Sequence, residues 1–175
     1  QVDPVSLSEV ILGCVTQQGE QAANIAKTSA LRAGWPASVA GMTINRFCSS
    51  SIDAIALAAM KVNCGQTSAL VAGGVEMMSR VPLLADGARV FADHDFGVNH
   101  QMLLMGAGAD LIASRGEMSR TDHDAVAFGS HQLALRAQKE ERFTSILPIA
   151  TSKGLVCSDE CVRPSLTPHR LAAMP

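Results

Sequence analysis

The chain has 175 residues, of which 47% are hydrophobic and 17% charged, with a formal net charge of -2. This composition predicts a folded domain with an aliphatic core rather than a disordered chain. Aromatic residues make up only 3%, and Lys and Arg form no block, so we expect no nucleic-acid surface.

Two further function classes are not expected. No apolar run reaches the roughly 18 residues that cross a bilayer, so we expect no membrane span. The chain starts Gln1-Val2-Asp3-Pro4, without a charged and then apolar leader, so we expect no signal peptide.

Five cysteines without regular spacing favour reduced thiols and a cytoplasmic location over a disulfide framework.

Strand and helix patterns alternate over the first 76 residues. In chain order we predict a strand at 9–15, a helix at 21–33 that stops at Gly34, a strand at 39–45, a helix at 49–63 that stops before Gly65, and a strand at 69–75. The second helix is apolar all round between residues 54 and 60, so we expect it to be buried. The alternation predicts an α/β fold with layered α/β/α organisation and a mixed, mostly parallel sheet.

After Glu76 the periodicity weakens. Helical patterns return at residues 103–115 and 122–142, an extended pattern follows at 142–150, and residues 151–175 are polar and predicted to be loop. We therefore expect three parts: a core at 1–76, an inserted loop region with a return helix at 77–150, and a loop segment at 151–175. Such insertions often carry binding functions on a rigid scaffold.

Cys48 is the strongest candidate for a catalytic residue. It falls where the predicted strand at 39–45 turns into the helix at 49–63, and the free N–H groups and dipole of a helix start favour negative charge. The thiolate is the reactive form of cysteine, and the same N–H groups can receive the oxyanion of an attacked acyl carbonyl. The small residues Ser49, Ser50 and Ser51 allow close approach, and their hydroxyls can cap the helix. The alternative interpretation of Cys48 is a buried packing residue.

The residues around Cys48 resemble the signature of the thiolase family. Residues 44–55 read INRFCSSSIDAI, and this segment is similar to the family's acyl-cysteine motif. In the expected order there follow 71–82 (VAGGVEMMSRVP), 105–111 (MGAGADL), 119–134, 146–149 and 159–164, each of which resembles a thiolase motif. The sequence just before Cys48, Asn45-Arg46-Phe47, is closer to that of degradative, β-oxidation-type thiolases than to that of biosynthetic ones.

The resemblance implies a thiolase-like fold and an acyl-CoA C-acyltransferase that cleaves or forms 3-ketoacyl-CoA. It implies that Cys48 carries the acyl group as a thioester, with its own backbone N–H in the oxyanion hole. Coenzyme A and acyl-CoA are then substrates rather than bound cofactors, and the whole enzyme is a homodimer or homotetramer. Met105 lines the acyl or pantetheine pocket by resemblance, or else simply packs in the core.

Two catalytic groups of the family have no counterpart in this sequence. The activating His of a Gly-His-Pro motif and the acid/base Cys of a Cys-x-Gly-x-Gly motif do not occur in the 175 residues. We therefore interpret the sequence as the N-terminal half of a thiolase and expect no thiolytic turnover from these residues alone. None of the histidines is expected to act as the base for Cys48: His94, His100, His123, His131 and His169.

Two alternative functions stay open. A β-ketoacyl synthase shares the Cys-Ser-Ser-Ser motif, but has small residues at the two positions where this chain has Arg46 and Phe47. A non-catalytic subunit with the thiolase fold would have no reason to keep the thiol of Cys48.

No metal site is expected. Cys157 and Cys161 do not have the spacing of a zinc-ligand pair, even with Asp159 and His169 nearby in the sequence. Cys14 and Cys64 are predicted to be structural.

Overall fold

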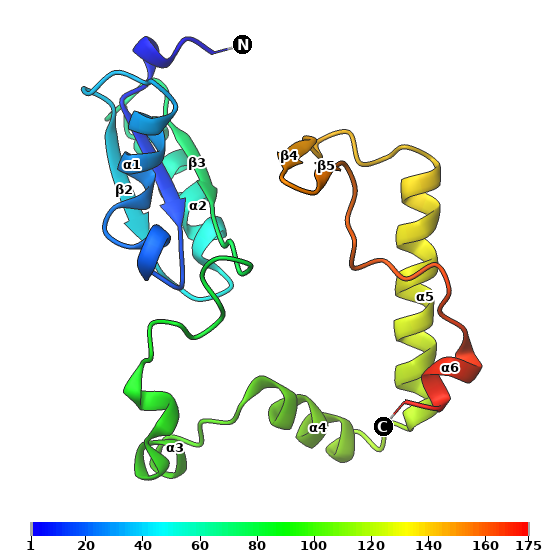
Figure 1. The fold of residues 1–175 in the computed structure, drawn as a ribbon. Helices are drawn as coiled ribbons and strands as arrows, with labels where there is room; N and C mark the ends of the chain where they lie inside the picture. The colour runs from blue at the N-terminus through cyan, green and yellow to red at the C-terminus, as the bar shows by residue number, and fades with distance from the viewer. Residues whose placement is uncertain (1, 175) are drawn as a thin grey trace. The chain divides into compact units, whose positions relative to one another are not determined.

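The chain forms two compact units, which span residues 1–98 and 99–175. The computed structural model describes residues 2–174, and Figure 1 gives the order of the elements along the chain. None of the described helices is long and apolar enough to cross a membrane. The division at residues 76 and 150 made from the sequence stays a prediction.

The first unit is built on a three-stranded parallel sheet in the order β2-β1-β3 (Figure 1). The strands are β1, Glu9–Gly13, β2, Ala40–Ile44, and β3, Val71–Gly74. Both outer strands pair in parallel with the central β1. The three predicted strands and their parallel direction are thus confirmed, with narrower bounds than the patterns suggested.

Two helices cover opposite faces of this sheet. α1, Ile25–Arg32, packs on β1 and β2, while α2, Ser50–Asn63, packs chiefly on β1 and β3. Gly41 lies directly against α1 and Gly13 directly against α2. Gly41 pairs with Val10, and side chains three residues apart on one strand point to opposite faces, so these glycines mark opposite sides of the sheet. The predicted α/β/α layering is confirmed.

The core of this unit is aliphatic, as the composition predicts. One cluster of buried residues comprises Leu7, Val10, Ala26, Ala30 and Val39, with Leu12, Trp35, Ala69 and Val71 packed around it. Ile11 and Cys14 are also fully buried. Because the central strand is covered on both sides, it contributes residues to both layers of the core.

α1 begins at Ile25 rather than at residue 21. Residues Gly19–Gln21 form a short 3-10 helix, η2, and the side chain of Asn24 then caps α1 by accepting the N–H of Lys27 at 3.1 Å. A capping side chain of this kind satisfies a free N–H at a helix start. Gln21 therefore lies outside α1, at the end of η2, where it is buried.

α2 ends where predicted and begins one residue later, at Ser50. It is not buried all round, so the prediction of a buried helix is wrong for the described residues of the first unit. Its buried residues are Ser50 and Ala54, whereas its large apolar side chains are exposed: Ile52, Ile55, Met60 and Val62. A sheet contacts only one side of a helix, and an all-apolar helix needs protein on both. The outer side of α2 has no such cover within the described residues of the first unit.

The remaining regular structure of the first unit is short. Pro4–Ser6 forms the 3-10 helix η1, Arg89–Ala92 forms η3, and His94–Asn99 forms α3. The stretch predicted to be irregular, 77–101, contains the last two of these elements.

The second unit is mainly helical. It contains α4, Met105–Arg115, α5, Arg120–Lys139, a hairpin of β4, Ile149–Thr151, and β5, Gly154–Val156, and α6, Pro168–Ala172. The two long helices are confirmed, but the loop predicted for 151–175 is wrong in part, because β5 and α6 lie there. Both elements are too short to show a periodic apolar pattern.

A helix cap and a pair of side-chain hydrogen bonds stabilise this unit. α5 starts with a capping box, in which Ser119 and Asp122 exchange side-chain and backbone hydrogen bonds. These bonds, first from the Ser119 hydroxyl, hold the pKa of the Asp122 carboxyl below its ordinary value. The guanidinium of Arg120 donates to the carbonyl oxygens of Leu171 at 2.8 Å and Met174 at 3.0 Å, which ties α6 to the start of α5.

Gly129 weakens the middle of α5, so replacing it with alanine is expected to stabilise the helix. A β-carbon at Gly129 meets no atom within 4 Å, and glycine costs about 0.5–1 kcal/mol relative to alanine inside a helix. Chemical denaturation of the complete protein should show Gly129→Ala more stable by about this amount. The reverse change, Ala125→Gly on the same helix, should destabilise by a similar amount, and a destabilising Gly129→Ala would contradict the argument.

Candidate active site

The segments that follow the three parallel strands meet at the carboxyl edge of the sheet. The N–H of Cys14 donates to the carbonyl of Ile44 at 2.9 Å, and the N–H of Val75 donates to the carbonyl of Gly13 at 2.9 Å. The chain passes from β1 to β2 on one side and then crosses to β3 on the other. Open parallel sheets bind ligands at the edge where the connections change direction in this way.

Cys48 lies at this edge, between the end of β2 and the start of α2, and its side chain is exposed. The preceding residue, Phe47, has a φ of 45°, a left-handed conformation that is uncommon for a residue with a β-carbon. The side-chain oxygen of Asn45 accepts the N–H of Phe47 at 2.9 Å. The thiol therefore sits at the position predicted from the sequence, on a sharp strand-to-helix turn.

Ser50 closes the turn from the helix side. Its hydroxyl accepts the N–H of Arg46 at 2.8 Å and donates to the carbonyl of Phe47 at 2.6 Å. The expected capping role is thus not shared by all three serines, because the N-cap residue Ser49 makes no side-chain cap. Two main-chain bonds of the turn are donated by Ser49 to the carbonyl of Arg46 at 3.1 Å and by Ser50 to the carbonyl of Phe47 at 3.0 Å.

A carboxylate that sequence reasoning did not single out, Glu76, lies just after β3 at the same edge. One of its oxygens accepts the N–H groups of Val15 at 2.5 Å and Thr16 at 3.1 Å, and the other accepts the side-chain N–H of Gln21 at 3.0 Å. Burial raises the pKa of the Glu76 carboxyl, but the hydrogen bonds from Val15, Gln21, Thr16 and Cys14 lower it by more. The net pKa is below its ordinary value, so Glu76 is an acceptor at neutral pH.

Cys14 is a different kind of thiol from Cys48. It is fully buried, and burial together with the charge of Glu76 raises its pKa. A thiol with a raised pKa is held in the protonated, unreactive form, which supports the structural role predicted for it. Cys64, at the C-cap of α2, is exposed.

The other residues considered from the sequence lie elsewhere. Met105 begins α4 in the second unit and is 82% exposed. His94 begins α3, while the remaining histidines belong to the second unit. One of these, His131, accepts the N–H of Arg163 through Nδ1 at 3.3 Å. That bond ties α5 to the later loop.

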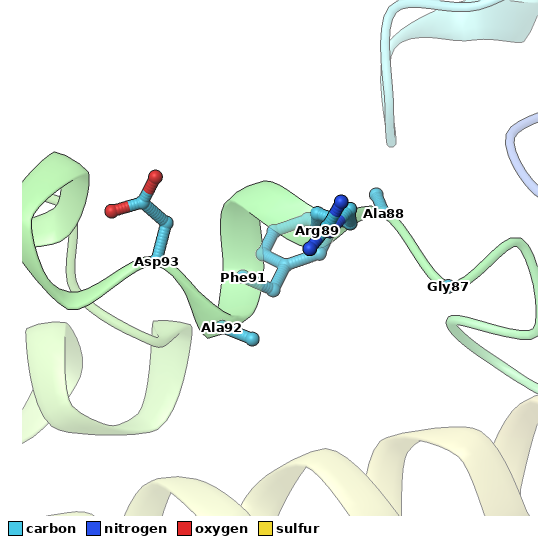
Figure 2. Close-up of a pocket in the computed structure, with 6 residues that line it drawn as sticks. All are labelled: Gly87, Ala88, Arg89, Phe91, Ala92 and Asp93. Carbon is cyan, nitrogen blue, oxygen red and sulfur yellow. The ribbon is translucent and has the colours of Figure 1, made fainter.

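Neither a metal centre nor a surface hollow beside η3 adds a site built by several elements within residues 2–174. No group of three or more His, Cys, Asp or Glu side chains in this range is arranged to hold a metal ion. A shallow hollow opens beside η3, and Figure 2 shows that its walls come from one consecutive stretch: Gly87, Ala88, Arg89, Phe91, Ala92 and Asp93. It is a surface feature of a single loop rather than a site that several elements build.

Sequence reasoning missed Asn45 and Glu76 as site residues, although both belong to the quoted motifs. A signal for them exists. Each is the first polar residue after one of the two outer strands, β2 or β3, and the carboxyl ends of parallel strands lie at one edge. Two such residues were therefore bound to lie near the turn that carries Cys48.

A parallel α/β layer with an exposed cysteine on the turn into a sheet-covering helix agrees with the thiolase class of fold. Residues 1–175 match the family described as "Thiolase, N-terminal domain", and the chain belongs to the thiolase family. The match extends over the full sequence, so both units described above are part of that family domain.

Three relatives show how close the similarity is. The chain is 39% identical to a beta-ketoadipyl-CoA thiolase of Pseudomonas knackmussii, over 99% of this chain and 49% of the relative. It is 37% identical to a 3-ketoacyl-CoA thiolase of Aliivibrio fischeri, over 99% and 46%. A crystal structure of the Bacillus anthracis acetyl-CoA acetyltransferase matches with a TM-score of 0.81 and 35% identity, covering 98% of this chain and 47% of that one. The chain thus spans about half the length of these relatives.

Proposed function

We propose that the complete protein is an acyl-CoA C-acyltransferase of the thiolase type in which Cys48 is the nucleophile. The observation that carries this proposal is the exposed thiol of Cys48 on a strained turn directly before the N-terminus of α2. Free N–H groups at that end can receive the negative charge of an attacked acyl carbonyl, and exposure leaves the thiol open to a substrate. The names of the relatives support a 3-ketoacyl-CoA as the substrate class.

In the direction of cleavage, the thiolate of Cys48 attacks the 3-keto carbonyl carbon of the substrate. The negative charge that develops on the carbonyl oxygen is received by backbone N–H groups, among them that of Cys48. The bond between carbons 2 and 3 then breaks, carbon 2 takes up a proton, and acetyl-CoA leaves. The shortened acyl group remains as a thioester on Cys48, until the thiol of a second coenzyme A displaces it and gives acyl-CoA.

The proton transfers need groups that this chain does not supply. The motifs that carry the family's activating His and acid/base Cys do not occur in the 175 residues, and Cys14 is buried and protonated. We therefore expect these residues by themselves to show no thiolytic turnover. A homodimer or homotetramer, a role in β-oxidation, a cytoplasmic location and a pocket contact for Met105 stay predictions from the family resemblance and the cysteine content.

The proposal predicts a covalent intermediate that can be trapped. When the complete protein is mixed with acetyl-CoA and quenched in acid, peptide mass spectrometry should find one acetyl group on the peptide that contains Cys48. The thioester survives acid and should disappear when coenzyme A is added before the quench, because the second half of the reaction then removes it.

Cys64 is the matched control, because its thiol is also exposed and lies at the opposite end of the same helix. Acetylation of Cys48 and Cys64 to the same extent would indicate non-specific chemistry at accessible thiols. No label at either position would favour the non-catalytic subunit. If malonyl-thioester, rather than acetyl-CoA, consumes the acetyl label on Cys48, with release of CO2 and formation of a 3-ketoacyl-thioester, the condensing-enzyme alternative would be favoured.

A further inference from the structure

Glu76 connects the segments that follow β1 and β3. Its carboxylate accepts the N–H groups of Val15 and Thr16 with one oxygen and the side chain of Gln21 with the other. Gln21 in turn donates to the carbonyl of Thr16 at 2.9 Å and accepts the N–H of Met77 at 2.6 Å. Gln21 and Thr16 are both 3% exposed. One ionised group therefore fixes the loop after β1 from several directions.

The loop after β1 is hydrogen-bonded to the turn that holds Cys48. The carbonyl of Val15 accepts the side-chain N–H of Asn45 at 3.3 Å, and the side-chain oxygen of Asn45 accepts the N–H of Phe47 at 2.9 Å. A continuous series of hydrogen bonds thus runs from Glu76 through Val15 and Asn45 to the residue just before Cys48. The amide of Asn45 is used at both ends, as donor and as acceptor, so its orientation is set by the loop that Glu76 holds.

The turn needs such support because its conformation is unfavourable in isolation. Phe47 has a positive φ without being glycine, and such residues persist where the surrounding structure over-determines them. The bonds to Phe47 come from two sides: Ser50 donates to its carbonyl from the helix, and Asn45 accepts its N–H from the strand. The strand-side bond is the one that depends on Glu76.

We propose that Glu76 and Asn45 are positioning residues, through which the end of β3 fixes the turn that presents Cys48 to the acyl substrate. This inference rests on the proposed function. Neither residue touches the reacting atoms in this account. Their effect is on the orientation of the Cys48 thiol relative to the N–H groups at the start of α2.

Two isosteric variants of the complete protein test the route. Glu76→Gln replaces one acceptor oxygen by a donor, which conflicts with the donors it faces, and Asn45→Asp removes the donor to Val15 while keeping the acceptor for Phe47. We expect each to lower kcat and the rate of Cys48 alkylation by iodoacetamide about 10- to 100-fold, because a small misplacement of a reacting group has effects of this size. KM should change little.

The double variant gives the readout that a merely structural role would not produce. Two residues that act through one series of bonds are not additive, so Glu76→Gln with Asn45→Asp should be no slower than the worse single variant. Multiplicative losses would show that the residues act independently, and wild-type kcat and alkylation rates in both single variants would overturn the proposal.

Three controls distinguish loss of the positioning role from a general loss of tertiary packing and from failure of the proposed function. Glu20→Gln removes a neighbouring carboxylate that forms an exposed ion pair with Arg80, and it should leave both rates unchanged. If Glu76→Gln exposes the buried Cys14 to alkylation, the fold has loosened and that variant no longer tests the positioning role. Asn45→Asp then provides the test, because it leaves the bonds of Glu76 to Val15, Thr16 and Gln21 intact. If wild-type Cys48 is neither acylated nor alkylated ahead of Cys64, the proposed function fails. If the wild type behaves as proposed and the variants match it, only the positioning role fails.

Discussion

Replacing Cys48 with alanine is expected to reduce kcat of the complete protein on the order of 10⁴-fold or more, because loss of a covalent nucleophile removes the whole chemical route. Binding of acyl-CoA should be nearly unaffected, since the substrate contacts remain. The melting temperature should also change little, because the side chain is exposed and supports no core contact. Steady-state thiolysis of a 3-ketoacyl-CoA and a thermal melt provide the two measurements.

Cys64→Ala is the control for that experiment. It removes another exposed thiol of the first unit, at the other end of α2, and should leave kcat at the wild-type level. Cys48→Ser is a stricter variant, because it keeps the size and hydrogen bonding of the group while a hydroxyl is scarcely ionised at neutral pH. Substantial turnover in Cys48→Ala would show that another group carries the acyl chain.

Replacing Gly13 with alanine should damage both stability and activity. A β-carbon at Gly13 would lie 2.5 Å from the carbonyl carbon of Ser50 and 2.6 Å from the nitrogen of Ser51, so the first turn of α2 must move. Overpacking of this kind costs about 1–3 kcal/mol. Because Ser50 holds the turn before Cys48, the displacement should also slow the acylation of Cys48. Chemical denaturation and the acetyl-trapping rate measure the two effects.

Gly73→Ala gives a matched comparison in the neighbouring strand. Gly73 pairs with Leu12, next to the pair formed by Gly13 and Gly74, but its β-carbon would meet only Leu12 Cδ2 at 3.7 Å. We expect a change within about 0.5 kcal/mol and no loss of acylation. Equal damage from the two variants would mean that the sheet tolerates no β-carbon in this region, and that close approach of α2 to Gly13 is not the cause.

A large part of the fold follows from local sequence patterns. The apolar runs that became β1, β2 and β3 are short, rich in branched residues and bounded by Gly or polar residues, and such runs predict strands without any knowledge of contacts. The same holds for the strand-to-helix turn at Cys48, because the change of pattern from Ile44 to Ser50 marks it. The start of α1 was misplaced because the cap at Asn24 is a local hydrogen bond that the apolar pattern does not reveal.

Long-range pairing decided the rest. The sequence by itself determined which segments are strands and helices, where the reactive thiol lies along the chain, and, through its motifs, which family the chain belongs to. Only the tertiary structure brought Val15, Asn45 and Glu76 together, because three segments far apart in the chain end at one edge of a sheet whose strand order is not written in any local pattern. Local periodicity reports which side of an element is apolar. It cannot report whether a partner covers that side, which is why the outer face of α2 was expected to be buried and is instead open within the described residues of the first unit.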